Sequence, residues 1–141
     1  DRLMPIQIQL DPIQHKKFSV LLAAASNDLR SLKRAIKRRH QDTYDEDDDE
    51  MFRQHNEKIF EQDVNEQGIN VVHIACALGN LGMLEYVLHN GGATLLNDQD
   101  RKGRTPLHYA ATNQSNECAE MLVEIGICDL NLKDQLGMTA L

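Results

Sequence analysis

The chain has 141 residues, of which 41% are hydrophobic and 26% charged, and its formal net charge is −7. This length suits one modest domain or a few small repeats, and the composition is ordinary for a globular protein. The segment 42–50 carries seven of the 22 acidic residues, and the other fifteen balance the fifteen Lys and Arg residues. The acidity is therefore local, which disfavours a chain-wide surface for nucleic acid.

The cysteines and the hydropathy bear on compartment. Cys76, Cys118 and Cys128 lack the paired spacing of a disulfide framework or a zinc ribbon. Each lies in an apolar run, where a reduced thiol packs as a small hydrophobe, so we expect the cytosol or the nucleus. No apolar stretch approaches the roughly 20 residues that span a bilayer, and no signal peptide opens the chain, so we expect no membrane partner. The start at Asp1, without Met, indicates an excised fragment.

Residues 1–17 are assigned to an N-terminal extension, in which Asp11 and Pro12 are a good start for a helix. Alternating apolar residues at positions 6–10 fit an extended segment and a flexible tail equally well. Residues 18–39 have apolar residues at helical spacing and predict a helix pair that caps one end of the molecule. The outer side of this pair is basic, with Arg30, Lys33, Arg34, Lys37, Arg38 and Arg39.

The basic cluster could contact phosphates or serve as a nuclear-localisation patch. We interpret it instead as a solvated face of the capping helix, partly neutralised by the acidic run that follows, and we expect no nucleic-acid partner.

Residues 40–63 are predicted to be an acidic insertion with a short helix. The run Asp45 to Glu50 lacks the Gly and the spaced ligands of a calcium loop. It fits a disordered tract that contacts a basic partner or shields the basic helix. Apolar residues from Met51 to Phe60 lie near helical spacing, which predicts a short helix that docks on the rest of the chain.

The rest of the chain repeats itself. Gly68, Gly103 and Gly137 are separated by 35 and 34 residues, and His73 and His108 share the first offset. Such a period indicates a stack of helix pairs. We place one unit at 64–97, a second at 98–133, and the start of a truncated third at 134–141.

The second unit reads Asp100-Arg-Lys-Gly103-Arg-Thr105-Pro106-Leu107-His108-Tyr-Ala-Ala. It resembles the ankyrin repeat, which has about 33 residues and a Thr-Pro-Leu-His-x-Ala core. Gly103 permits positive φ in a tight turn. Thr105 can cap the first helix, with Pro106 at its first position and Leu107 in the core. The resemblance implies that His108 bonds backbone between neighbouring turns.

The other copies depart from this pattern. In the unit 64–97, Gly68 and His73 match, whereas Asn70 and Val71 replace Thr and Pro; Asn also caps well. The unit 18–39 is a degenerate capping repeat in which Asn27 stands where ankyrin repeats carry Gly. A weak leading repeat followed by regular ones is also faintly similar to the start of inversin-type scaffolds.

The resemblance implies an all-α solenoid of stacked helix-turn-helix ankyrin repeats with projecting β-turn or hairpin loops. It also implies a concave groove in which the turns and the exposed side of each first helix contact a partner. We expect Ile69, Leu78, Leu136 and Met138 to be apolar contacts without a core role. Charge reversal at Arg101 or Arg104 is expected to weaken binding and leave the fold intact. The implied contact residues are Glu66, Gln67, Ile69, Ala77, Leu78, Arg101, Lys102, Arg104, Thr112, Asn113, Gln135, Leu136 and Met138.

Catalysis and cofactor binding are not expected. His73 and Cys76 have the i, i+3 spacing of a metal pair, but no third or fourth ligand is near in sequence. No nucleophile elbow, phosphate loop or carboxylate pair is present in the repeats. We therefore expect a non-catalytic scaffold or adaptor that binds a partner protein. Two alternatives stay open, a docking or regulatory region of a larger enzyme or channel and a self-associating structural segment.

Overall fold

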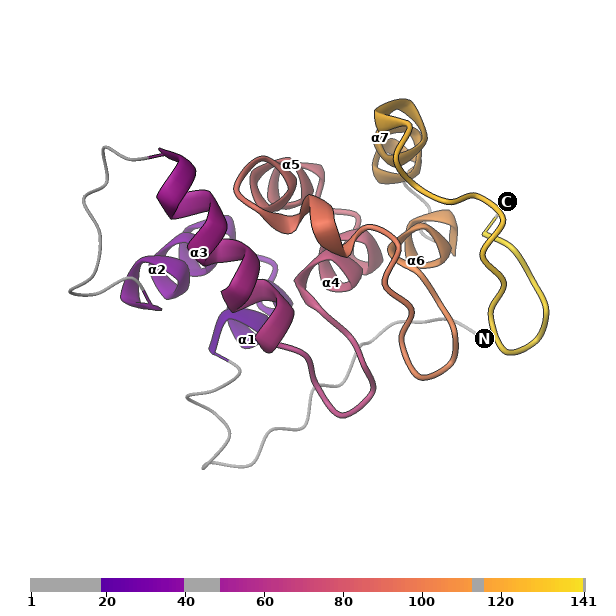
Figure 1. Cartoon of the computed structure of the whole chain (residues 1–141), viewed down its shortest axis with the longest axis horizontal. Coiled ribbons are helices and arrows are strands. Elements are labelled where there is room, and N and C mark those ends of the chain that lie inside the picture. The colour runs from indigo at the N-terminus through magenta and orange to yellow at the C-terminus, as the bar shows by residue number, and fades with distance from the viewer. Residues whose placement is uncertain (1–18, 40–48, 113–115, 141) are drawn as a thin grey trace.

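The computed structural model describes residues 19–39, 49–112 and 116–140 (Figure 1). The predicted helix start at Asp11, the extended segment 6–10, most of the acidic run and the predicted contact Asn113 lie outside these residues. Within them, the regular structure consists of α-helices and one 3-10 helix, in the following order: α1 (Ser19–Ala25), α2 (Leu29–Arg39), α3 (Asp49–Gln62), α4 (Val71–Leu78), α5 (Leu81–His89), η1 (Gly92–Leu95), α6 (Pro106–Thr112) and α7 (Glu117–Ile125).

The helices form a stack, as the sequence predicted. α1 packs against both α2 and α4, and α4 packs against α5 and α6. The inner helices α4 and α6 lie next to each other, and their partners α5 and α7 lie on the same side of them (Figure 1). The loops before α4, before α6 and after α7 project from one edge of this stack (Figure 1).

Polar residues at the helix ends set where each helix begins. The Asn70 side chain accepts hydrogen bonds from the backbone N–H groups of Val72 and His73, so the substituted cap of this repeat is a working one. Asn80 caps α5 in the same way by accepting from the Met83 N–H. Between α1 and α2, Asn27 adopts φ +59°. Asn is one of the few residues that enter this region readily, which explains how it can stand in the place of glycine.

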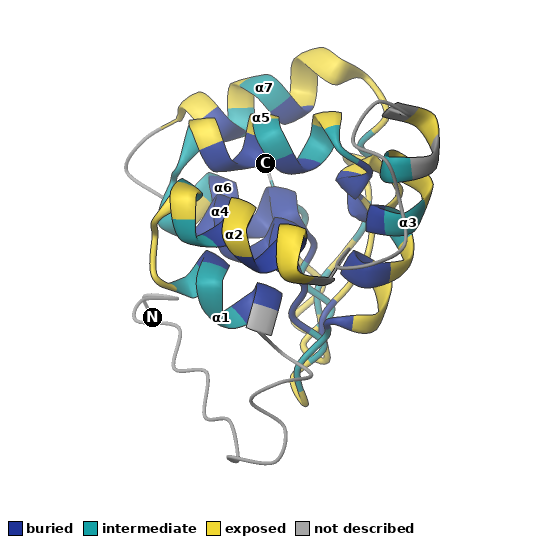
Figure 2. Ribbon diagram, turned by 90° about the vertical axis from the view of Figure 1, so that its left-hand side faces the viewer, coloured by how far each residue is buried: buried dark blue, intermediate teal, exposed yellow. Residues whose placement is uncertain are grey.

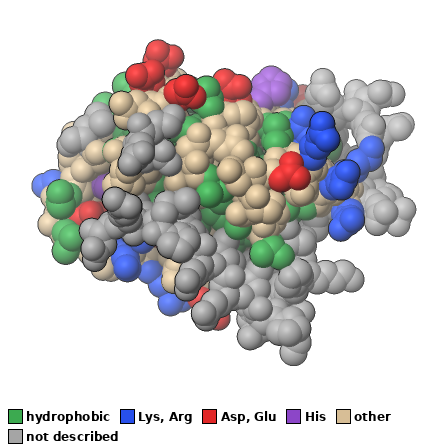
Figure 3. Space-filling model, turned by 180° about the vertical axis from the view of Figure 1, so that it is seen from behind, with side chains coloured by type: hydrophobic (Ala, Val, Ile, Leu, Met, Phe, Trp, Pro, Cys, Tyr) green, Lys and Arg blue, Asp and Glu red, His purple; other side chains and the backbone are tan. Residues whose placement is uncertain are grey.

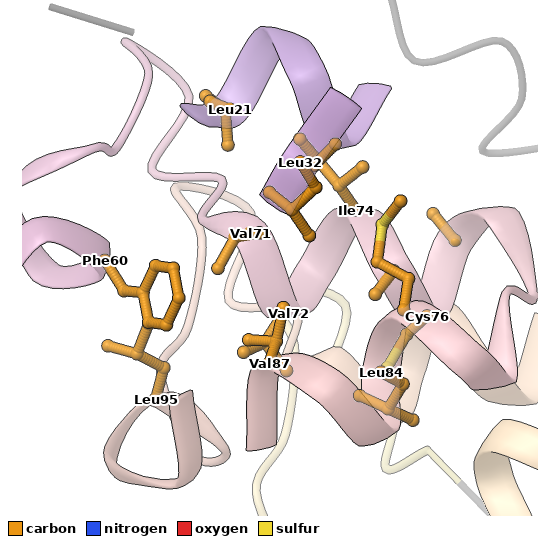
Figure 4. Close-up of a cluster of buried hydrophobic side chains, with 14 of the residues drawn as sticks. Leu21, Leu32, Phe60, Val71, Val72, Ile74, Cys76, Leu84, Val87 and Leu95 are labelled. Atoms are coloured by element: carbon orange, nitrogen blue, oxygen red, sulfur yellow. The ribbon is translucent and has the colours of Figure 1, made fainter. Parts of the chain in front are cut away.

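A single apolar core runs through the stack. The side of α2 that faces α1 is buried, whereas its opposite side is exposed, as Figure 2 shows by colour. In α4 every residue from Val71 to Ala77 is buried because helices pack on it from several directions. Figure 4 shows the centre of this core, where Leu32 lies near Ile74, and Val72 lies near Val87.

The helix in the insertion is longer than the segment that the apolar spacing marked. α3 has 14 residues, and it contributes the buried residues Ile59 and Phe60 to the core. It packs against η1, and Figure 4 places the Phe60 ring beside Leu95. The contact is close, because a Cβ atom at Gly91 would lie 2.7 Å from the Arg53 carbonyl oxygen. The insertion therefore closes one side of the core instead of lying apart from it.

Candidate functional site

Three projecting turns share one backbone design, organised by an Asn or Asp side chain. Asn65 Oδ1 accepts hydrogen bonds from the N–H groups two and four residues later, both at 2.9 Å. Asp100 Oδ1 does the same at 2.9 Å for both bonds. Asp134 Oδ1 repeats the arrangement at 2.9 and 3.0 Å. The turns 65–69, 100–104 and 134–138 are therefore three copies of one polar scaffold.

The turns are tied to one another through their backbones. Arg101 N–H donates to the Gln67 carbonyl, and Gln135 N–H donates to the Lys102 carbonyl, each at 2.9 Å. The Gln135 side chain adds a bond to the Arg101 carbonyl. These bonds hold the tips of successive turns in register, so that their side chains form a regular row.

The repeat histidines join each inner helix to the next turn. His73 Nδ1 accepts from Asn70 N–H at 3.2 Å, which leaves the Nε2 proton to be donated to the Arg104 carbonyl at 3.0 Å. His108 repeats this with Thr105 N–H at 3.1 Å and the Met138 carbonyl at 2.9 Å. This is the backbone bond between neighbouring turns that the resemblance implied. One imidazole thus closes its own helix cap and fixes the turn of the next layer.

This double role makes the fold sensitive to pH, because only neutral imidazole can accept at Nδ1. Burial of His73 lowers its pKa below the ordinary 6.5, although the Arg104 carbonyl and Asp100 act in the opposite direction. Below pH 6.5 the unfolded chain therefore binds a proton that the folded chain refuses. We expect the free energy of unfolding to fall as the pH drops below 6.5, by about 1.4 kcal/mol for each unit of pKa depression. An NMR titration in which the His73 ring protonates at or above pH 6.5 would contradict this.

Asp100 is the centre of the most connected turn. Its second oxygen, Oδ2, accepts from the Tyr109 hydroxyl and from Arg104 Nε, the latter at 3.2 Å. The Arg104 guanidinium lies over the Tyr109 ring at 4.8 Å, and the His73 ring meets the same ring edge-on at 5.5 Å. Burial alone would raise the pKa of Asp100, but the Tyr109 hydroxyl and the Arg104 backbone and guanidinium lower it below its ordinary value. Burial and the neighbouring carboxylate raise the pKa of Tyr109.

Most of the predicted contact residues of the turns lie at the surface. The two residues after each Asn or Asp form the tip of the turn, and all six of these tip residues are exposed. Leu136 and Met138 are 83% and 61% exposed, more than any other large hydrophobic residue in the described part of the chain. Thr112 is exposed at the end of α6. The tip residues are Glu66, Gln67, Arg101, Lys102, Gln135 and Leu136.

Other predicted contact residues do not have the free, exposed side chains that were expected of them. Ile69 and Ala77 are 2% and 3% exposed, so neither can present a side chain to a partner. Leu78 is partly buried against the core and therefore has the core role that it was expected to lack. Arg104 is held by Asp100 and Tyr109, so reversal of its charge would disturb the fold.

Asn65, Asp100 and Asp134 were not predicted to organise the turns. A signal for them is present, since they are separated by 35 and 34 residues, the same offsets that relate the three glycines. Each lies three residues before its glycine, and an Asn or Asp at the start of a tight turn commonly accepts hydrogen bonds from the backbone N–H groups that follow it.

In the described part of the chain, no cluster of three or more His, Cys, Asp or Glu side chains is placed to hold a metal ion. Cys76 and Cys118 are buried, and burial raises the pKa of both thiols, which makes them poor nucleophiles. Among the same residues, no helix has the length and apolar character required to cross a bilayer.

The chain is similar to known proteins over most of its length. The family model for ankyrin repeats, with three copies, matches residues 20–134. A chain in the crystal structure of the yeast ribosomal protein Rps3 in complex with its chaperone Yar1 has a TM-score of 0.71 and 20% identity. The match covers 94% of this chain and 83% of that one. At this identity the likeness concerns the fold alone.

Curated relatives match about half of this chain. The ADP-ribosylation factor GTPase-activating protein AGD4 of Arabidopsis thaliana is 33% identical over 53% of this chain and 9% of its own length. Inversin of Mus musculus is 37% identical over 50% of this chain and 6% of its own. NF-kappa-B inhibitor alpha of Gallus gallus is 34% identical over 57% of this chain and 26% of its own. The chain thus spans only a small part of each of these relatives.

Proposed function

Because this chain belongs to the ankyrin-repeat family, we propose that it is a non-catalytic interaction module that binds a partner protein through the tips of its turns. Ankyrin repeats are protein-interaction modules, and stacked repeats present an extended surface to a partner. In this chain the binding surface is the row of tips on the turns 65–69, 100–104 and 134–138.

The observation that carries this proposal is that, within each turn, the residues that build the turn differ from those that are exposed at its tip. The Asn or Asp, the glycine and the backbone bonds build the turn, and they are the same in all three copies. The tip side chains are exposed, and only Gln135 uses its side chain in a described hydrogen bond. Since folding leaves the identity of the other tip residues largely free, they are the positions where a partner can be distinguished.

The tips also differ in chemistry along the row. The first pair, Glu66 and Gln67, is acidic and polar, whereas the second pair, Arg101 and Lys102, is basic. The third turn is apolar through Leu136 and Met138, and a cleft of about 570 Å³ opens between this turn and α6. A partner segment that lies along the row would place an acidic group opposite the second turn and an apolar side chain opposite the third.

The test is a comparison of two charge-reversed proteins. Arg101→Glu with Lys102→Glu changes the second tip, whereas Arg53→Glu with Lys58→Glu makes the same change of charge on the exposed side of α3. We expect affinity enrichment with the tip variant to lose, at least tenfold, protein partners that the wild-type chain and the α3 variant retain. Equal recovery of every partner by all three chains would reject the row of tips as the binding surface. Solution mass of the chain alone separates this proposal from self-association.

One observation favours a docking or regulatory role inside a larger enzyme as a second candidate. The chain matches 9% of the length of a GTPase-activating protein and 7% of a palmitoyltransferase, AKR1 of Candida glabrata. In that setting the same tips would recognise a substrate or another region of the enzyme.

A further inference from the structure

The solvent side of α2 carries a dense group of cations, which we call the basic face: Arg30, Lys33, Arg34, Lys37 and Arg38. All five are exposed, while Leu32, Ala35 and Ile36 on the opposite side of the helix are buried. Figure 3 shows Lys and Arg side chains gathered over one end of the molecule, the end at which Figure 1 places α2. The basic face is therefore separate from the tips of the turns 100–104 and 134–138.

The stability of α2 itself does not explain the row of three arginines. Arg30, Arg34 and Arg38 are spaced at i, i+4 and i+8, and like charges at this spacing repel one another along a helix. Cations near the end of a helix are favoured by its dipole, but Arg30 lies in the first turn, where the dipole disfavours it. Asp28 caps α2, where its carboxylate accepts from Arg30 N–H and the Ser31 hydroxyl, and its charge acts on Arg30 at the start of the face.

A cleft beside the basic face adds an apolar element. About 390 Å³ of open space lies between α1 and α2, and its apolar lining comes from Leu22, Ala23 and Ala35. Arg34 and Arg38 line the same cleft, together with Ser26 and Ser31. Two guanidinium groups thus stand beside a small apolar floor, an arrangement suited to an apolar side chain flanked by carboxylates.

We propose that the basic face and its cleft form a second interaction surface, which binds an acidic segment of a partner protein with an apolar side chain in the cleft. Single-stranded nucleic acid fits less well, because it needs exposed aromatic rings on which bases stack. In the described part of the chain, Phe60 and Tyr109 are buried and Phe52 is partly buried. Tyr86 is also partly buried, with the Lys33 ammonium 5.0 Å from its ring centre.

The test uses fluorescence anisotropy with labelled probes and the full chain at low salt. The probe is a 12-residue peptide of Asp and Glu around a central Leu. Comparison probes are the same peptide with Asn and Gln, the same peptide with Ser for Leu, and a 12-nucleotide single-stranded DNA. The variant Arg30→Glu/Arg34→Glu/Arg38→Glu reverses three charges of the basic face. Its charge-matched control is Arg53→Glu/Lys58→Glu/Lys133→Glu, at three exposed cations outside both the basic face and the tips.

We expect the acidic peptide to bind the wild type and the control with affinities within twofold of each other. Its affinity for the Arg30→Glu/Arg34→Glu/Arg38→Glu variant, called the basic-face variant, should be at least tenfold lower. The amide peptide should not bind, and the Ser peptide should bind severalfold more weakly than the Leu peptide. The proposal is overturned if the acidic peptide does not bind, or if it binds the basic-face variant as tightly as the wild type. Tighter binding of the DNA than of the acidic peptide overturns it in favour of a phosphate-binding face. Melting curves verify that each variant folds. If the basic-face variant fails to fold, a variant with Gln at the same three positions takes its place.

Discussion

Replacing Asp100 by alanine is expected to lower the free energy of unfolding by about 2–4 kcal/mol, the usual range when one partner of a buried polar network is removed. The carboxylate is buried, and it is the acceptor for two backbone N–H groups, the Tyr109 hydroxyl and Arg104 Nε. Alanine leaves all four donors without this acceptor. Chemical denaturation of the full chain measures the effect, and a loss of less than about 1 kcal/mol would contradict the role assigned to the network.

The chain supplies a control within itself. Asn65 builds the same turn with a neutral amide oxygen, so Asp100→Asn should keep the two backbone bonds and lose only the charged acceptor for Tyr109 and Arg104. We expect roughly half of the alanine effect. Because the pKa of Asp100 lies below its ordinary 3.8 in the folded chain, its contribution is complete above that pH and is lost as the pH falls further. Neither variant should show this part of the acid transition.

The repeat period was sufficient to predict the stack but not the way its turns are held. Glycine and histidine spacing placed the two regular repeats, because a stacked helix pair needs the same turn and the same cap in every layer. The exposure of individual residues was harder to predict. Ile69 looked like a surface residue beside the turn, yet it is 2% exposed, which its place in the sequence beside a turn does not reveal.

The candidate surface was likewise predictable from the sequence only in part. The tips were predictable because they immediately precede the repeating glycines. Arg104 was misjudged because a cation in a turn suggests a free contact, whereas its position opposite Asp100 and over Tyr109 arises only when the turn closes. The length of α3 and its contribution to the core were underestimated for a similar reason. Its apolar residues are few, and η1, the element that they cover, has no signal in the repeat pattern.

Replacing Gly103 by alanine is expected to destabilise the fold by about 2–3 kcal/mol, from two separable causes. The first is conformational, since φ at Gly103 is +76°, a region that costs an alanine about 1 kcal/mol. The second is steric. A Cβ atom there would lie 3.0 Å from Asp134 Cα and from Gln135 N, the atom that donates to the Lys102 carbonyl. The added carbon would therefore press on the bond that joins two successive turns.

Gly137 separates the two causes. Its φ is +78°, but a Cβ atom there would meet no atom within 4 Å, so Gly137→Ala should lose only the conformational part, about 1 kcal/mol. Gly68 lies between them, with backbone atoms of Asp100 and Arg101 at 3.2 Å from its added Cβ. The three alanine variants should therefore rank Gly103, Gly68, Gly137 in loss of unfolding free energy. Equal losses at Gly103 and Gly137 would mean that the turns do not depend on close approach between layers.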